Sequence, residues 1–280
     1  MKVLVAEKCG FCPGVRNAIT LAKKTLKHND IVYSLGPIIH NEDVVRQLAE
    51  SGLHTVSQIE SIPGGTVLIR SHGATSAELD EIQQRGLDIV DATCVLVKRV
   101  QKIARQLHDE GYHVVIIGDK DHPEVKAVVG SAPDIEVIGS EEDLDKLSNS
   151  NKLGVICQTT QSPEYFAKML AAVARHGFSE MKVINTLCRE TMERQKAAVK
   201  LCRQVDIMFV LGGLHSANTR KLAELCKNHN PQTFHLQNWQ ELDKTTLLGK
   251  TTAGVTAGAS TPDEVIDAFV QNLRDFEPKP

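Results

Sequence analysis

The sequence predicts an α/β protein made of three similar units with parallel sheets, and two observations carry that prediction. Along the whole 280 residues, apolar runs typical of strands alternate with segments of helical periodicity, and the connections between them are short. Three of the strand-like runs also end shortly before a cysteine that precedes a helix, namely Cys12, Cys94 and Cys188. The spacing indicates that one unit of structure is repeated three times.

The expected elements can be placed in order along the chain. Runs such as HVVIIG and LGVIC indicate strands because they are short, apolar and bounded by turn residues. Strands are expected at residues 2–6, 30–36, 66–70, 87–92, 113–118, 153–157, 182–185, 206–212 and 253–258. Helices are expected at residues 15–27, 76–85, 95–109, 163–175, 191–203, 217–228 and 262–274. The sequence has no linker, charge block or low-complexity tract between them.

Composition argues against several classes of function. The net charge of -3 gives no reason to expect nucleic acid, and an aromatic content of 4% leaves few platforms for stacked bases. The opening MKVLVAE is strand-like and lacks a signal-peptide pattern, and no apolar run is long enough to span a membrane. We therefore expect a cytoplasmic protein without nucleic acid or membrane partners. Its seven cysteines favour metal, cluster or packing roles over a disulfide framework.

The repeat extends beyond the cysteines to polar loops. After each cysteine and its helix comes a strand that ends in GPIIHN, GDKDHPE or GGLHSAN, so that His40, His122 and Ser216 each lie 28 residues past their cysteine. A third strand of each unit ends in a further polar loop, at His72, at Thr159 and Thr160, and at Ser260. Because ligands of open α/β sheets bind at the carboxyl ends of the strands, beside helix N-termini, these loops are the candidate site.

Three thiolates could converge on one point if the units are arranged around a pseudo-threefold axis. Such a set could hold zinc, with His40, His72 or His122 as a fourth ligand, or an iron–sulfur cluster. A four-iron cluster normally takes four cysteines, so three would leave one iron open for a substrate oxygen. The spacing of the cysteines does not choose between these two metals.

The other loop residues offer neutral donors and one acid. Serine, threonine, histidine and asparagine side chains at helix N-termini can hold a diphosphate without a P-loop, and no P-loop or dinucleotide fingerprint is present. The donors are His40, Asn41, Ser71, His72, His122, Thr159, Thr160, Ser216, Asn218 and Ser260. Glu124 follows His122 and Pro123, where a carboxyl group is a plausible proton source for a departing hydroxide.

The remaining cysteines receive plainer interpretations. Cys202 and Cys226 fall in helical patterns and Cys157 ends a strand, so packing is expected for all three. Cys9 forms a C-x-x-C with Cys12, which is compatible with a redox dithiol or half of a metal site. The places equivalent to Cys9 in the other units are Asp91 and Asn185, so the spacing of Cys9 is not repeated.

Taken together, the motifs resemble those of the 4-hydroxy-3-methylbut-2-enyl diphosphate reductases, the IspH/LytB family. The matching stretches, which run from residue 10 to 263, are GFCPGV, GPIIHN, RSHG, DATC, HPEV, QTTQ, NTLC, SANTRKL and TAGASTPD. The resemblance implies three lobes in a trefoil around a central [4Fe–4S] cluster, one per chain, ligated by Cys12, Cys94 and Cys188. It implies lobes at 13–95, at 96–188 and at 189–280, the last completed by residues 1–12.

The activity that the resemblance implies is the last step of the methylerythritol phosphate route to isoprenoids. The open iron binds the substrate hydroxyl, electrons arrive singly from a ferredoxin or flavodoxin, and the hydroxyl leaves as water to give isopentenyl and dimethylallyl diphosphate. Glu124 and Thr159 take the catalytic positions, with Glu124 delivering protons. The substrate and diphosphate positions are His40, His72, His122, Thr159, Thr160, Ser216, Ala217, Asn218 and Ser260.

A few positions depart from the family pattern. Ala217 stands where serine is common, which removes one side-chain donor but keeps the backbone N–H, and His215 stands where asparagine is usual. Val95 follows Cys94 where proline is usual, and Arg189 follows Cys188. None of these changes removes a ligand or Glu124; substrate affinity and product ratio are the properties they bear on.

Two other functions remain compatible with the cysteines. A non-enzymatic cluster carrier or redox sensor would need the three thiolates but neither Glu124 nor the polar loops. A dithiol oxidoreductase would use Cys9 and Cys12 and would leave Cys94 and Cys188 without a role.

Overall fold

The computed structural model describes residues 1–29, 31–148, 150–214 and 216–276, which form three four-stranded parallel sheets flanked by helices. The first sheet contains β2 (Val32–Leu35), β3 (Leu53–Val56), β4 (Thr66–Ile69) and β5 (Asp88–Asp91). The second contains β6 (His113–Ile117), β7 (Glu136–Ile138), β8 (Lys152–Cys157) and β9 (Glu180–Val183). The third contains β10 (Ile207–Leu211), β11 (Thr233–Leu236), β12 (Thr252–Ala257) and β1 (Lys2–Val5).

All three sheets have the same topology. Their strand orders are β3-β2-β4-β5, β7-β6-β8-β9 and, read in the same sense, β11-β10-β12-β1. The first strand of the chain therefore takes the fourth place in the last sheet, where Lys2 pairs with Thr252 and Val5 with Val255. In each sheet the strand that leads to a repeated cysteine is an edge strand, which leaves the loop after it free to turn away from the sheet.

Helices connect the strands, as parallel pairing requires. They are α1 (Pro13–Leu26), α2 (Glu42–Glu50), α3 (Ser76–Gln84), α4 (Val95–Asp109), α5 (Pro123–Val129), α6 (Pro163–Val173), α7 (Arg189–Cys202), α8 (Ala217–His229) and α9 (Asp263–Asp275). Short 3₁₀ segments are η1 (Ile59–Ser61), η2 (Glu141–Lys146), η3 (Ala174–His176), η4 (Trp239–Glu241) and η5 (Lys244–Leu247). Capping fixes where several helices begin: Thr75 forms a capping box with Glu78, and Ser162 caps α6 just before Pro163.

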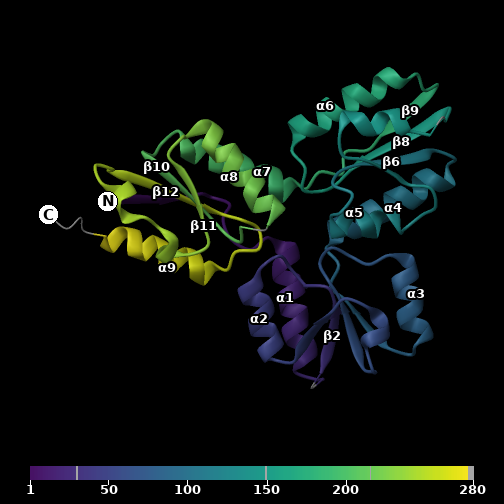
Figure 1. Ribbon diagram of the computed structural model, residues 1–280, viewed down its shortest axis with the longest axis horizontal. Helices are drawn as coiled ribbons and strands as arrows, with labels where there is room; N and C mark the ends of the chain where they lie inside the picture. Colours follow the sequence, from purple (N-terminus) through teal and green to yellow (C-terminus); the bar gives the residue numbers. More distant parts are fainter. Residues whose placement is uncertain (30, 149, 215, 277–280) are drawn as a thin grey trace. The chain divides into compact units, whose positions relative to one another are not determined.

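The third sheet shows how the cores are built. Alternate residues of β10 point to opposite faces, so Phe209 and Leu211 pack toward α9 whereas Met208 and Val210 pack toward α7 and α8. Figure 1 shows α9 on one side of this sheet and α7 with α8 on the other. The strand is buried on both faces, which is why its sequence reads as a continuous apolar run.

By its internal contacts the chain forms two compact units. One contains Met1–Arg16, His40–Arg46 and the chain from Arg189 on, and therefore holds the third sheet. The other contains Asn17–Ile39 and Gln47–Cys188, and therefore holds the first and second sheets. Within this second unit, a backbone hydrogen bond from Ser76 to Gly130 ties α3 to the end of α5.

The predicted fold class, an α/β protein with parallel sheets in three lobes, is confirmed. Every strand and helix expected from the sequence is present within a few residues of its expected bounds. The expectation was incomplete in a regular way, because it omitted one edge strand of each sheet (β3, β7 and β11) and the short helices α2 and α5. Among the described residues, no helix is long and apolar enough to cross a membrane.

Candidate functional site

The three repeated cysteines share one local structure. The backbone N–H of each donates to a carbonyl in the loop that follows the third strand of its sheet: Cys12 to Ala259 at 3.1 Å, Cys94 to Ser71 at 2.9 Å and Cys188 to Thr159 at 2.8 Å. Each cysteine also stands immediately before a helix, α1, α4 or α7. The matched spacing in the sequence therefore corresponds to a matched backbone position at the carboxyl edge of a sheet.

The three cysteine side chains at this position are candidate metal ligands. All three side chains are of intermediate exposure, so they are accessible to a ligand. The backbone N–H of Val15 points at Cys12 Sγ at 3.5 Å, and Cys94 is the N-cap residue of α4. A helix N-terminus stabilises a thiolate through its unpaired N–H groups and its dipole. Cysteine sulfur is a soft donor, and three such residues fit the cysteine ligation of an iron–sulfur cluster.

Glu124 and Thr159 form a buried pair within the unit that holds the first two sheets. Glu124 is only 2% exposed, and its two carboxylate oxygens accept hydrogen bonds from the Thr159 backbone N–H at 2.6 Å and from Thr159 Oγ1 at 2.8 Å. Burial raises the pKa of Glu124, and the two hydrogen bonds from Thr159 oppose that rise. The carbonyl of the same threonine accepts from Cys188, so one residue joins the acid to a candidate ligand.

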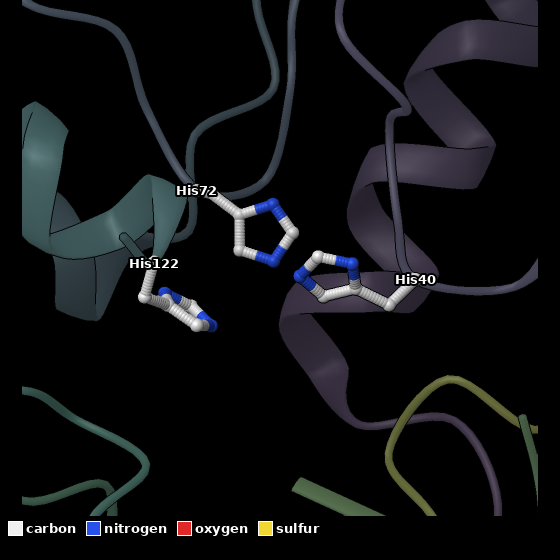
Figure 2. Close-up of side chains that lie close together, drawn as sticks. All are labelled: His40, His72 and His122. Carbon is white, nitrogen blue, oxygen red and sulfur yellow. The ribbon is translucent and has the colours of Figure 1, made fainter. Parts of the chain in front are cut away.

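Two histidines lie beside this pair. His122 caps α5, and its Nδ1 accepts a hydrogen bond from the Glu124 backbone N–H at 3.1 Å. Because Nδ1 is an acceptor, a neutral His122 ring carries its proton on Nε2, which can donate to an anion. The rings of His72 and His122 meet edge to face with their centroids 5.6 Å apart, and Figure 2 shows both side chains.

The loop that carries His72 needs the glycine that follows it. Gly73 has φ of +85°, and a Cβ at this position would lie 3.3 Å from Thr93 Cγ2 and 3.4 Å from Ala127 Cβ. A glycine is therefore favoured here by both its backbone angle and its surroundings. Elsewhere in this unit, Thr160 Oγ1 accepts from the side chain of Gln158 at 3.1 Å, which fixes the second half of the QTTQ loop.

The other unit brings a second group of the predicted residues together. Ser260 Oγ donates to the His40 carbonyl at 2.9 Å, and the Asn41 side chain donates back to the Ser260 carbonyl at 2.8 Å. Ser216 caps α8 by accepting from the Thr219 backbone N–H, so residues 217 and 218 form the first turn of that helix. The predicted positions Ala217 and Asn218 thus lie at a helix N-terminus, whereas His215 lies outside the described residues.

The position three residues before each cysteine has different roles in the three lobes. Asp91 and Asn185 accept hydrogen bonds from the backbone N–H two residues further on, Thr93 at 2.9 Å and Leu187 at 3.0 Å. These are turns closed by a side chain, which a cysteine does not form readily. Cys9 instead packs against the core of the third sheet, and burial raises the pKa of its thiol to about 11.

The other cysteines are buried in the interior, as expected for packing residues. Cys202 and Cys226 lie in one apolar cluster between α7, α8 and the third sheet, and their thiols are hydrogen bonded to each other. Cys157 ends β8, where its backbone N–H donates to Thr186 Oγ1 at 2.8 Å.

Sequence reasoning missed two residues that support the cysteine loops, Thr186 and Arg194. Thr186 is buried and pins the loop before Cys188 to the end of β8. Arg194 is 3% exposed, although it reads as an ordinary basic residue of a helix. One signal was available for it: the position six residues after each cysteine is Ala18, Val100 and Arg194, two small or apolar residues and one cation.

Comparisons with known proteins connect this chain to one family. The model of the family described as LytB protein matches residues 3–274. A relative from Geobacter sulfurreducens is 43% identical over 280 residues, which cover 100% of this chain and 99% of the relative. One from Pelobacter propionicus is also 43% identical over 280 residues, with 100% of both chains covered. Both are described as 4-hydroxy-3-methylbut-2-enyl diphosphate reductase.

Two solved structures have the same fold. One is described as (E)-4-hydroxy-3-methyl-but-2-enyl diphosphate reductase, the terminal enzyme of the non-mevalonate pathway; it is 38% identical, covers 99% of this chain and 100% of its own, and has a TM-score of 0.77. The other, the E-1-hydroxy-2-methyl-but-2-enyl-4-diphosphate reductase from Plasmodium falciparum, is 28% identical with a TM-score of 0.92. It covers 98% of this chain and 88% of its own.

Proposed function

The chain belongs to the LytB protein family, and from that premise we propose that it is a 4-hydroxy-3-methylbut-2-enyl diphosphate reductase of the non-mevalonate route to isoprenoids. The reaction replaces the allylic hydroxyl of the substrate by hydrogen. Two electrons and two protons enter, the carbon–oxygen bond breaks, and water leaves with isopentenyl or dimethylallyl diphosphate as the product. A ferredoxin or flavodoxin would deliver the electrons one at a time.

We assign the cluster ligands to Cys12, Cys94 and Cys188, each contributed by one of the proposed lobes (189–280 with 1–12, 13–95 and 96–188). The soft donors, their equal backbone positions and the adjacent helix N-termini support this assignment. When bound there, a [4Fe–4S] cluster would supply single electrons and an iron without a cysteine ligand that can accept the substrate hydroxyl.

Glu124 would supply the proton that lets hydroxide leave as water. The observation that carries this role is the buried chain of hydrogen bonds from Glu124 through Thr159 to the backbone of Cys188. Since burial raises the pKa of Glu124, this carboxyl holds its proton to a higher pH than an exposed one. Thr159 Oγ1 donates to the carboxylate here; a protonated Glu124 would instead donate its O–H to Thr159 Oγ1, which would free the threonine proton for another acceptor.

The diphosphate would be held by neutral donors and backbone amides rather than by lysines or a P-loop. His72 and His122 can donate through ring N–H groups, and Ser216, Ala217 and Asn218 stand at the N-terminus of α8. His40 and Ser260 complete the proposed set, together with Thr160. Ala217 offers only its backbone N–H, so this chain is expected to hold the diphosphate with one donor fewer than relatives with serine there.

The test is turnover of the allylic diphosphate by anaerobically purified protein with a chemical one-electron reductant. Glu124→Gln keeps the shape of the side chain but cannot supply the proton, so we expect turnover to fall by about 100-fold or more with the iron content unchanged. Glu142→Gln, on the exposed 3₁₀ segment η2, is the matched control and should retain full activity.

Three outcomes would contradict the proposal. Full activity of Glu124→Gln would remove the proton role from this residue. An anaerobic preparation that is colourless and carries one zinc per chain would exclude a cluster enzyme altogether. A preparation with the cluster but without turnover of the wild-type protein would favour the non-enzymatic carrier or sensor, which needs the thiolates but not the Glu124–Thr159 pair.

A further inference from the structure

The loops that carry the three cysteines differ in length. β5 ends at Asp91, three residues before Cys94, and β9 ends at Val183, five residues before Cys188. β1 ends at Val5, seven residues before Cys12. Because a longer loop has more conformations to lose, the segment before Cys12 has the greatest need for additional anchors.

The two shorter loops are held by their own side chains. Asp91 closes the turn before Cys94, and before Cys188 the turn of Asn185 is joined by Thr186, which bonds to the end of β8. The longest loop is held by a residue from outside it. Arg194 on α7 donates through Nη2 to the Gly10 carbonyl at 2.7 Å and through Nη1 to the Ala257 carbonyl at 2.8 Å.

Burial of the Arg194 side chain is unfavourable in itself. The residue is 3% exposed, and burial removes the hydration of its guanidinium, a loss that contacts in the fold must offset. The equivalent positions of the other two lobes bury Ala18 and Val100 instead, so the helix does not require a cation there for packing. The two short hydrogen bonds join the loop before Cys12 to the end of β12, where Ala257 lies.

The charge of Arg194 also reaches the cysteine loop. Its guanidinium contacts the Gly10 carbonyl at 2.7 Å, so a positive charge stands at this loop. Cys9 and Gly10 lie three and two residues before Cys12. A fixed positive charge near a cluster stabilises its reduced form, because reduction adds negative charge.

We propose that Arg194 is a positioning residue that holds the Cys12 loop on the end of β12 and makes a cluster ligated by Cys12 easier to reduce. The second part rests on the proposed function, whereas the first part concerns the protein without any cluster. The residue touches neither substrate nor reacting atoms in this role; it acts through Gly10 and the ligand that follows it.

The first experiment uses the metal-free full-length protein, so it does not depend on the proposed function. Arg194→Met removes both hydrogen bonds, and Arg194→Lys keeps the charge but cannot span two carbonyls in the same way. Arg203→Met, at an exposed position just after α7, is the control for loss of one charge. We expect amide hydrogen exchange in residues 7–12 to become severalfold faster in both Arg194 variants and to stay unchanged around Cys94 and in Arg203→Met.

The second experiment measures the midpoint of cluster reduction by EPR in the reconstituted holoprotein. Arg194→Met should shift it to more negative potential, Arg194→Lys should remain close to wild type, and Arg203→Met should not move it.

Unchanged exchange in both Arg194 variants would overturn the anchoring role, and equal midpoints in Arg194→Met and wild type would overturn the role in reduction. A wild-type protein that binds no cluster would refute the proposed function while the exchange result still decides the anchor. If Arg194→Met fails to fold, Arg194→Gln, which also removes the charge, replaces it in both measurements, and an unchanged midpoint in Arg194→Gln overturns the role in reduction.

Discussion

At the residue scale, Glu124 couples the stability of the fold to pH. Its pKa lies above the ordinary value of 4.5 because burial disfavours the carboxylate, so the folded state binds this proton more tightly than the unfolded state does. The stability that the neutral carboxyl contributes to the fold is fully present when the pH is below the pKa of Glu124 in the unfolded chain. It is lost as the pH rises through the pKa of Glu124 in the folded protein. The hydrogen bonds from Thr159 reduce this effect without reversing it.

The upward shift of the Glu124 pKa gives a prediction for the metal-free protein. Glu124→Gln keeps a neutral, isosteric group at every pH, so its melting temperature relative to wild type should rise as the pH is raised from about 5 to about 8. Melting curves of both proteins over that range, followed by circular dichroism, test it. Glu142→Gln serves again as the exposed control, and parallel curves for Glu124→Gln and wild type would show that the burial of Glu124 leaves no proton linkage.

Residues of the site differ in how readily the sequence predicts them. Cys12, Cys94, Cys188 and the polar loop residues could be selected because they follow strand ends at matched spacing, which the topology then places at one edge of each sheet. Arg194 could not be selected in that way, since a basic residue in a helix is most often exposed. Its importance depends on burial and on two carbonyls distant in sequence, Gly10 and Ala257, which only the folded chain brings to it.

At the element scale, the strands that the sequence did not predict share a place in the fold. β3, β7 and β11 have only four, three and four residues, and each occupies the edge of its sheet opposite the strand that leads to a cysteine. Their sequences LHTV, EVI and TFHL mix polar and apolar residues, because an edge strand is only partly covered. Strands buried on both faces, such as β8 and β10, carry the apolar runs from which strands are predicted.

One helix, α4, also carries a side chain that joins two lobes. Gln101 Nε2 donates to the Ala74 carbonyl and to the Ala127 carbonyl, both at 3.0 Å. These carbonyls follow β4 in the first lobe and belong to α5 in the second, and both lobes lie in the same compact unit. The Gln101 side chain therefore links neighbouring lobes through two hydrogen bonds.

We predict that Gln101→Leu lowers the free energy of unfolding by about 1–3 kcal/mol, because it leaves two partly buried carbonyls without this donor. Urea denaturation followed by circular dichroism measures the change. Gln106→Leu is the matched control on the same helix, since the Gln106 side chain donates to the exposed Glu110 in a pair worth about 0.5 kcal/mol or less. Equal midpoints for the two variants would mean that Gln101 contributes nothing beyond a surface pair.

At the scale of the whole molecule, one topology is used three times and the chain begins inside the last repeat. β1 occupies in the third sheet the place that β5 and β9 occupy in the others, so Cys12 follows β1 as Cys94 and Cys188 follow their strands. The three cysteines are therefore equivalent in one backbone hydrogen bond, because each N–H donates to the loop that follows β12, β4 or β8. Equivalent placement predicts equivalent loss when any one of them is removed.

The last prediction compares these three cysteines with their neighbour Cys9. Cys12→Ser, Cys94→Ser and Cys188→Ser should each abolish turnover and lose most of the iron and sulfide bound per chain, because a hydroxyl is a poor ligand for a soft cluster. Cys9→Ser should keep both, since Cys9 packs into the core of the third sheet and its pKa of about 11 keeps the thiol protonated at neutral pH. Iron and sulfide analysis with EPR of the four variants decides the point. Loss of the cluster in Cys9→Ser with retention in Cys188→Ser would instead assign the chemistry to the C-x-x-C pair, in conflict with the equivalence of the three lobes.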